Sequence, residues 1–163
     1  MSDSNVTFKN GRIHDVVVRP LAKFLDERGW LSELFRLDEL DGMMKPAMAY
    51  LSMTRPGVAR GPHEHAEQTD YFCFLGPSNF KIYLWDRRPG SPSYGVRQVF
   101  YAGLDAPAMV VVPPGVVHAY KNVGIENGLV FNAPDRLYAG EGKMSPVDEI
   151  RHEDLEGSPF HLG

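Results

Sequence analysis

The chain has 163 residues, of which 43% are hydrophobic and 23% are charged, a size and composition typical of one globular domain with one core. Its formal net charge is −4, and its lysines and arginines are scattered, which argues against nucleic acid as a partner. No apolar run approaches the ~18 residues of a membrane-spanning helix, so we expect no membrane contact. The N-terminus lacks a secretory signal pattern, and the single cysteine, Cys73, cannot form an internal disulfide. We therefore expect a cytoplasmic protein in which Cys73 is an inert buried thiol.

Glycines and prolines divide the sequence into short apolar or alternating runs, which are typical of strands and turns. The expected strands, in chain order, cover residues 16–18, 31–36, 47–54, 71–75, 80–85, 96–101, 109–112 and 129–132. So many short strands predict an all-β sandwich or barrel. Residues 37–44 and 145–148 predict short peripheral helical turns, the second with Ser145 as N-cap. We expect a single domain over residues 1–163, with residues 1–15 and 155–163 as tails.

Three histidines stand in two motifs that are far apart in the sequence. His63 and His65 are two residues apart, so in a strand both side chains would lie on the same face. Asp70 follows them closely, and His118 comes much later, just after a Pro-Pro-Gly turn. A single histidine near a turn is usually an ordinary polar residue, but three imidazoles and a carboxylate suit a divalent metal such as Zn, Fe, Mn or Ni. The pattern therefore makes His63, His65, Asp70 and His118 a candidate metal site, with Glu64 and Glu67 as competing carboxylates.

The spacing of these motifs, His-x-His-x4-Asp followed by Pro-x-Gly-x2-His-x3-Asn, resembles that of the cupin superfamily. A longer set resembles the dTDP-4-dehydrorhamnose 3,5-epimerase family, whose landmarks are D-x-R-G-x-F-x-E, R-G-x-H, D-x-R-x-x-S-P-T-F-G and P-x-G-x-x-H-G-F. The matching segments here are residues 26–33, 60–63, 86–95 and 113–118. This resemblance implies a cupin double-stranded β-helix, a jelly-roll barrel, that forms a homodimer through N-terminal strands. It also implies an isomerase that inverts a carbon beside the 4-keto group of a dTDP-deoxy sugar and requires no cofactor.

The same resemblance assigns roles to individual residues. His63 corresponds to the general base that removes a proton next to the ketone, and Asp154 to the carboxylate that orients it. The alternative for Asp154 is a solvated acidic residue of the C-terminal tail. His118 corresponds to the second histidine of the barrel and should face the site. The expected contacts to the nucleotide sugar, including two arginines for its diphosphate, are Arg28, Glu33, Arg60 and Tyr138.

The chain departs from the family pattern at catalytic positions. The lysine that stabilises the enolate falls at Asp70, and the acid tyrosine falls at Asn132. A carboxylate cannot neutralise an oxyanion, and an amide cannot donate a proton as an acid, although it can hydrogen-bond a carbonyl. The family glutamine becomes His65, and the polar pair before that strand becomes Met48 and Tyr50. Because the changes to Asp70 and His65 add metal ligands, a divalent ion could take over stabilisation of the enolate.

Three functions remain open on this basis. The first is an epimerase or isomerase acting on a nucleotide sugar with His63 as base. The second is a metal-dependent cupin enzyme acting on another small molecule, with His63 among the ligands. The third is a non-catalytic barrel that binds a sugar nucleotide. The first two conflict over His63, because an imidazole bound to a metal is not a free base.

Overall fold

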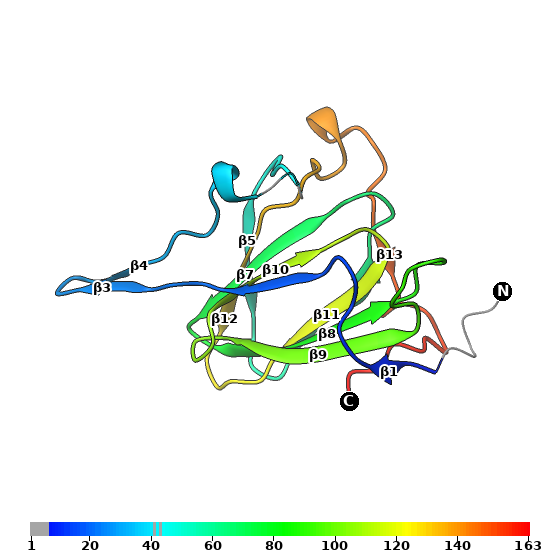
Figure 1. Ribbon diagram of the computed structural model, residues 1–163, viewed down its shortest axis with the longest axis horizontal. Coiled ribbons are helices and arrows are strands. Elements are labelled where there is room, and N and C mark those ends of the chain that lie inside the picture. The colour runs from blue at the N-terminus through cyan, green and yellow to red at the C-terminus, as the bar shows by residue number, and fades with distance from the viewer. Residues whose placement is uncertain (1–6, 41, 43) are drawn as a thin grey trace.

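Two β-sheets face each other across a shared apolar interior (Figure 1), as described for residues 7–40, 42 and 44–163 of a computed structural model. The six-stranded sheet has the order β1 (Lys9–Asn10), β9 (Val96–Gly103), β8 (Asn79–Asp86), β11 (Val116–Asn122), β6 (Ala59–Glu64) and β13 (Ile150–Arg151). The five-stranded sheet has the order β2 (Val17–Pro20), β10 (Ala108–Val112), β7 (Asp70–Gly76), β12 (Gly128–Asn132) and β5 (Tyr50–Thr54). All neighbouring strands are antiparallel except β1 and β9. The expected all-β barrel is confirmed.

Alternation along each strand separates an inner face from an outer one. On β7, Phe72 and Phe74 belong to the core between the sheets, whereas Tyr71 and Cys73 belong to a second apolar cluster. Burial raises the pKa of the Cys73 thiol to about 12, so the thiolate does not form at neutral pH. The expectation of an inert buried cysteine agrees with this position.

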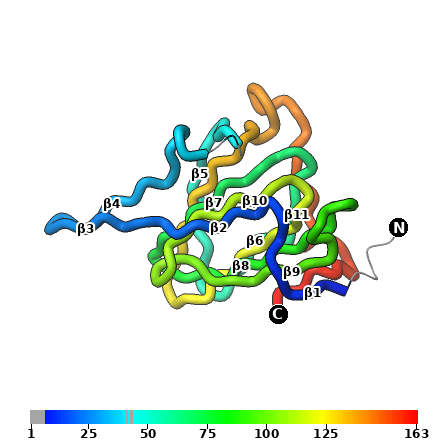
Figure 2. The backbone as a smooth tube through the Cα atoms, viewed as in Figure 1, coloured from blue at the N-terminus to red at the C-terminus, as the bar shows by residue number. Residues whose placement is uncertain are grey.

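A small hairpin, β3 (Phe24–Asp26) with β4 (Gly29–Leu31), projects away from the two sheets (Figures 1 and 2). The predicted strand over residues 31–36 is therefore wrong beyond Leu31. Leu34 and Phe35 instead pack against the outer cluster of the five-stranded sheet, and the Leu34 carbonyl accepts a hydrogen bond of 2.8 Å from the Tyr71 hydroxyl. The apolar run is buried by packing on a sheet face rather than by pairing at a sheet edge.

Helical structure is limited to two short 3-10 turns, η2 (Leu37–Glu39) and η3 (Glu141–Lys143), in the part of the chain that is described. None of the described helices has the length and apolarity needed to span a membrane. The turn predicted over residues 145–148 is wrong, because Asp148 accepts backbone hydrogen bonds from another loop instead of starting a helix.

Parts of the terminal segments expected as tails pack against the barrel. Ile13 belongs to the core between the sheets, and the Phe160 ring contacts those of Phe8 and Trp85. The C-terminal segment accordingly lies beside β1 (Figure 2). Residues 1–6 of the expected N-terminal tail lie outside the described residues.

Candidate active site

Three imidazoles, from β6, from β11 and from the residue after β6, lie together in the interior. His63 on β6 is paired across the ladder with His118 on β11, and their ring centroids are 4.4 Å apart. His65 follows β6 directly, and one ring nitrogen from each histidine lies within 4.8 Å of the others. His65 and His118 are buried, whereas His63 is half-buried. The two motifs that are distant in sequence thus form one cluster, as their spacing predicted.

Gly61 allows the two histidine-bearing strands to come this close. Its φ of +79° lies in the left-handed region, and an added Cβ would lie 2.5 Å from the His118 carbonyl oxygen and 2.9 Å from His63 Nδ1. No other residue fits this position without displacing backbone or imidazole. The glycine of the R-G-x-H motif is therefore required by the packing of the site.

The five-stranded sheet contributes a carboxylate, an amide and a phenol to the same interior. Asp70 begins β7 and is only 1% exposed, on the inner face with Phe72. The Asn132 side chain donates from Nδ2 to Asp70 Oδ1 at 2.9 Å and to the Tyr50 hydroxyl at 2.9 Å. Its Oδ1 accepts the Tyr71 amide at 3.0 Å, which fixes the orientation of the amide group. The imidazoles of one sheet thus face a hydrogen-bonded polar row on the other.

Backbone carbonyls define which nitrogen carries the proton on two of the histidines. His118 Nδ1 lies 3.0 Å from the Val116 carbonyl oxygen, and His65 Nδ1 contacts the Asp148 carbonyl oxygen. Because a carbonyl only accepts, both Nδ1 atoms must be donors, so in neutral rings both Nε2 atoms carry lone pairs. Each Nε2 lies 3.2 Å from Asp70 Oδ2, and that of His118 has no aligned hydrogen bond. If both rings were neutral, their Nε2 lone pairs would point at the Asp70 carboxylate. A proton or another cation is therefore needed between the imidazole nitrogens and the carboxylate oxygen.

The charges of the cluster follow from these contacts. Burial, followed by the neighbouring imidazoles of His118 and His65, lowers the pKa of His63 to about 2. Burial also opposes charge on His65, but the hydrogen bond and the negative charge of Asp70 outweigh it and raise the pKa of His65 to about 9. Burial acts to raise the pKa of Asp70, but the two adjacent imidazoles outweigh it and hold that pKa well below its usual range. At neutral pH His63 is thus a neutral imidazole beside an ionised pair.

Asp148 ties the C-terminal segment to the loop between β6 and β7. Its carboxylate accepts the backbone amides of Ala66, Glu67 and Gln68 at 2.8, 2.9 and 2.9 Å. Burial opposes ionisation, but these three hydrogen bonds outweigh it and lower the pKa of Asp148. The Gln68 side chain held in this way donates to Asp70 Oδ1 at 2.9 Å. Asp148 therefore orients one loop and, through its carbonyl, one imidazole of the site.

The expected partnership between Asp154 and His63 is not formed. Asp154 is exposed beyond β13, and no hydrogen bond or ion pair joins it to His63 among the described residues. The carboxylate and histidine that do meet in this region are Glu64 and His152, whose Oε1 and Nε2 atoms are 2.8 Å apart. Glu64 points away from the cluster because it alternates with His63 along β6, so it cannot take over the role expected of Asp154.

The expected substrate contacts are dispersed. Arg28 is in the β3–β4 turn, with a side chain 84% exposed and paired with Asp26. Arg60 on β6 donates to Thr54 Oγ1 at 3.0 Å and to the Met53 carbonyl at 2.7 Å, which fixes it against β5. Arg60 is thus joined to the strand that carries Tyr50. Arg28 lies between β3 and β4, the hairpin that projects away from the sheets (Figure 1).

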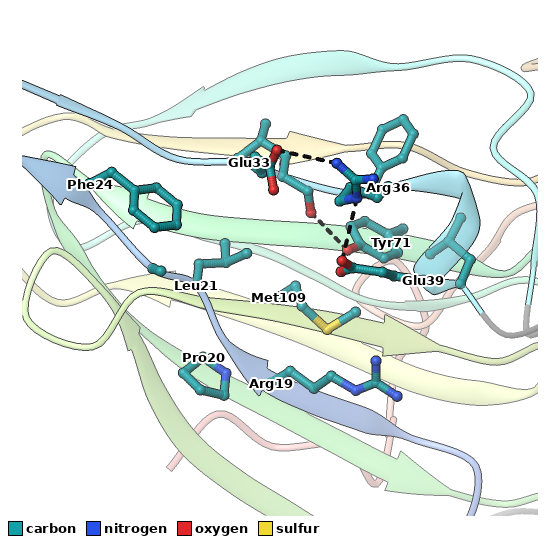
Figure 3. Close-up of a pocket in the computed structure, with 13 residues that line it drawn as sticks. Arg19, Pro20, Leu21, Phe24, Glu33, Arg36, Glu39, Tyr71 and Met109 are labelled. Atoms are coloured by element: carbon teal, nitrogen blue, oxygen red, sulfur yellow. Dashed lines mark hydrogen bonds and ion pairs between the residues drawn. The ribbon is translucent and has the colours of Figure 1, made fainter.

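Glu33 lies on the outer side of the five-stranded sheet. It lines a hollow of about 200 Å³ with Tyr71 and Met109, and Arg36 Nη1 lies 3.6 Å from its carboxylate (Figure 3). Tyr71 and Met109 belong to the outer cluster, so the sheet separates this hollow from the histidines. Tyr138 is also exposed, in the loop after β12, where its amide contacts the Met48 sulfur at 3.1 Å. Neither residue contacts the histidine cluster.

Sequence reasoning missed the roles of Tyr50, Gln68 and Asp148 in this arrangement. Tyr50 alternates with Ser52 and Thr54 along β5, and this alternation is the signal that could have placed it on the inner face. Asp148 had no local signal, because its partners are about 80 residues earlier in the chain. Long-range contacts of this kind are set by the topology of the barrel.

A closed pair of β-sheets with paired histidine motifs on its inner face defines a cupin-type barrel. The chain also matches the family model for dTDP-4-dehydrorhamnose 3,5-epimerase over residues 10–147. It therefore belongs to the dTDP-4-dehydrorhamnose 3,5-epimerase family, and it is an isomerase of the epimerase type. The resemblance inferred from the motifs is confirmed.

Individual relatives agree with this assignment. Agl13 of Haloferax volcanii, a probable low-salt glycan biosynthesis epimerase, is 41% identical over 128 residues, which cover 77% of this chain and 81% of that protein. The spore coat polysaccharide biosynthesis protein SpsL of Bacillus subtilis is 35% identical over 112 residues, which cover 69% of this chain and 73% of that protein. The structure of a dTDP sugar isomerase from Desulfovibrio desulfuricans G20 has the same fold, with a TM-score of 0.77, 21% identity and 91% of each chain covered.

Proposed function

We propose that the protein epimerises a carbon next to the 4-keto group of a dTDP-linked deoxy sugar, with His63 as the general base. The position of His63 carries the proposal: it is half-buried and neutral at neutral pH, so its lone pair is available to a carbon acid in the interior. The pKa of His63 is low for a base, and the developing negative charge of an enolate beside it would raise that pKa. Protonation of His63 and formation of the enolate thus stabilise each other within the cluster.

The proposed division of roles follows the geometry. His65, paired with Asp70, is a cation at neutral pH and can stabilise the enolate oxygen in place of the family lysine. Arg60, exposed beside β5, is the proposed contact to the diphosphate of the nucleotide, because a guanidinium suits phosphate oxygens. His118 supports His63 by ring contact and is not needed as a second base.

The test is solvent exchange on dTDP-4-keto-6-deoxyglucose in heavy water, followed by NMR at C3 and C5. We expect deuterium to enter rapidly at the carbon whose proton lies within reach of His63, and slowly at the other carbon. His63→Ala should slow the exchange by about 10²–10⁴-fold, the usual contribution of a general base. His161→Ala, at an exposed histidine near the C-terminus, is the matched control and should exchange at the wild-type rate.

Two outcomes would count against this function. Wild-type protein that exchanges neither carbon, with or without added metal, would favour another cupin reaction or a binding role. Rapid exchange that survives His63→Ala would remove His63 as the base and require another residue to take the proton.

A second candidate, a metal-dependent cupin enzyme, is favoured by one specific observation. His65 and His118 each direct Nδ1 at a backbone carbonyl and Nε2 at Asp70 Oδ2, an arrangement common among metal-bound histidines. The 3.2 Å separations between each Nε2 and Asp70 Oδ2 also agree with the roughly 3.0–3.4 Å between neighbouring ligands around one ion. A bound divalent ion would act as a Lewis acid on a substrate oxygen. The ligands would be the three histidines, His63, His65 and His118, together with Asp70, so His63 would not be a free base in this candidate.

Metal content decides between the two candidates. In the second candidate, protein purified without added metal contains about one divalent ion per chain by mass spectrometry of the digested sample, and Asp70→Ala loses it. Glu156→Gln, at an exposed carboxylate of the C-terminal segment, should leave the metal content unchanged. Protein that lacks metal and takes up no added Zn²⁺ would exclude this candidate and leave the ionised pair of His65 and Asp70 as the functional state.

We propose in addition that the protein is a cytoplasmic homodimer. The compartment is supported by a single cysteine, Cys73, buried as a free thiol. Dimerisation is supported by β2, an edge strand of the five-stranded sheet, and by the exposed apolar side chains of the β3–β4 hairpin beside it.

A further inference from the structure

Tyr50 stands directly opposite the residue that replaces the family acid. Tyr50 on β5 and Asn132 on β12 are register partners in an antiparallel pair, so their side chains lie on the same face of the sheet. Along β5, Ser52 contacts the hydroxyl of Tyr120 in the core, and Thr54 is buried against Arg60. Because Tyr50 alternates with these residues, it faces the interior and not the outer surface.

The hydroxyl of Tyr50 has a hydrogen available for donation. Asn132 Nδ2 donates to the Tyr50 oxygen at 2.9 Å, so the oxygen acts as an acceptor in that contact. Among the hydrogen bonds of the described residues, none uses Tyr50 as a donor. The residue is 44% exposed, which leaves the phenol within reach of a bound molecule, and burial raises its pKa, so the phenol is protonated at neutral pH.

We propose that Tyr50 is the proton donor of the epimerisation, and that Asn132 positions it, so that the acid has moved from β12 to the facing position on β5. This inference rests on the proposed function and names the acid that function requires. Inversion needs a base and an acid on opposite faces of the reacting carbon. His63 enters the interior from the six-stranded sheet and Tyr50 from the five-stranded sheet, as this geometry demands.

His63 and Tyr50 each transfer one proton in the proposed reaction. His63 takes the proton on the carbon beside the ketone, the C–H electron pair becomes the new C=C bond, and the carbonyl electron pair moves to oxygen as an enolate. When the carbonyl re-forms, the carbon takes the proton of the Tyr50 hydroxyl on its opposite face and a phenolate remains. Transfer of the proton from His63 to the phenolate through solvent restores both groups. No oxidant, reductant or co-reactant is required.

Tyr50→Phe separates the two halves of this reaction. Without the phenol, His63 still removes the proton and returns a deuteron to the same face, so the substrate gains deuterium but keeps its configuration. We expect the inverted product in heavy water to form about 10²–10⁴-fold more slowly, while exchange at the same carbon stays within a few-fold of wild type and KM is unchanged. Tyr101→Phe removes an exposed hydroxyl from β9 and should leave both rates unchanged.

Asn132→Ala provides a second measurement that a purely structural role would not reproduce. It should lower the rate of inversion more than the rate of exchange while Tyr50 is present, and add little in a Tyr50→Phe background. A Tyr50→Phe variant that inverts at the wild-type rate, or loses exchange and inversion equally while still folded, would overturn the assignment. Wild-type protein that shows no exchange would overturn the proposed function and this assignment together. Wild-type exchange combined with either of the Tyr50→Phe results above would overturn this assignment alone.

Discussion

At the scale of single residues, the cluster combines two histidines whose proton affinities are shifted in opposite directions. His63 has its pKa lowered to about 2 and His65 has its pKa raised to about 9, although their rings are only 5.7 Å apart. The difference arises because Asp70 pairs with His65 and forms no ion pair with His63 in the described part of the chain. One carboxylate therefore decides which imidazole is the cation and which is the free base.

These opposite shifts predict a stability maximum near pH 6.5 in chelator-treated protein. Since His65 binds its proton more tightly when folded, its stabilisation is complete below the unfolded pKa of about 6.5 and is lost as the pH rises towards 9. Folding lowers the pKa of His63, so below pH 6.5 the unfolded chain binds a proton there that the folded protein does not. The free energy of unfolding therefore falls with the pH, by at most about 1.4 kcal/mol per pH unit. Urea unfolding between pH 5 and 9 measures both limbs.

His65→Gln should flatten the alkaline limb of this curve, and His63→Gln the acidic limb. Asp70 remains ionised throughout the range because its pKa is held well below its usual value, so it contributes to neither limb. A stability curve that is flat across the range in wild-type protein would contradict the assigned charges.

At the scale of elements, the segment before β13 fastens the loop that carries Gln68 to the barrel. Asp148→Ala removes the acceptor of three backbone amides, and we expect a loss of about 1–3 kcal/mol in the free energy of unfolding. Deuterium exchange on the substrate should also fall, because without the carboxylate the backbone carbonyl of residue 148, which contacts His65, is no longer held in place. Asp148→Asn keeps one side-chain oxygen as acceptor, so its losses should be smaller.

Glu156→Gln is the control for this prediction, because it changes an exposed carboxylate beyond β13. Urea unfolding and the exchange assay should detect no difference between Glu156→Gln and wild type. If Asp148→Ala were as stable and as active as that control, the contacts of Asp148 would have no energetic role.

At the scale of the whole molecule, the N-terminal part of the barrel presents an unpaired edge beside an exposed apolar arm. Strand β2 pairs only with β10 among the described strands, and Leu25 in the adjoining hairpin is 80% exposed. We expect a homodimer, with a mass by sedimentation equilibrium of about twice the 18.3 kDa of one chain. Val18→Lys on β2 and Leu25→Glu should each shift the mass towards the monomer, because charge on an edge strand or an apolar contact opposes pairing.

Val123→Lys is the matched control for the dimer prediction, since Val123 is exposed in the loop after β11. It should sediment like wild type. A monomeric mass for wild-type protein at micromolar concentration would contradict the predicted homodimer. The exposed hairpin would then not be covered by a second copy of the chain.

Short-range patterns in the sequence determined the class of fold and the histidine cluster. Strands over residues 71–75, 80–85 and 109–112 were predictable because alternation and apolar runs reflect the burial of each strand face. His63 and His118 were predictable as neighbours because both stand in motifs whose spacing resembles that of a known family. The strand predicted over residues 31–36 failed because an apolar run buries its side chains equally well by packing on a sheet.

Only the tertiary structure decided which polar groups meet inside the barrel. It placed Tyr50 opposite Asn132, brought Asp148 to His65, and left Asp154 exposed. The sequence could not show these contacts, because the partners come from strands and loops about 80 residues apart. Their meeting depends on strand order and register, which are set by the packing of the whole core.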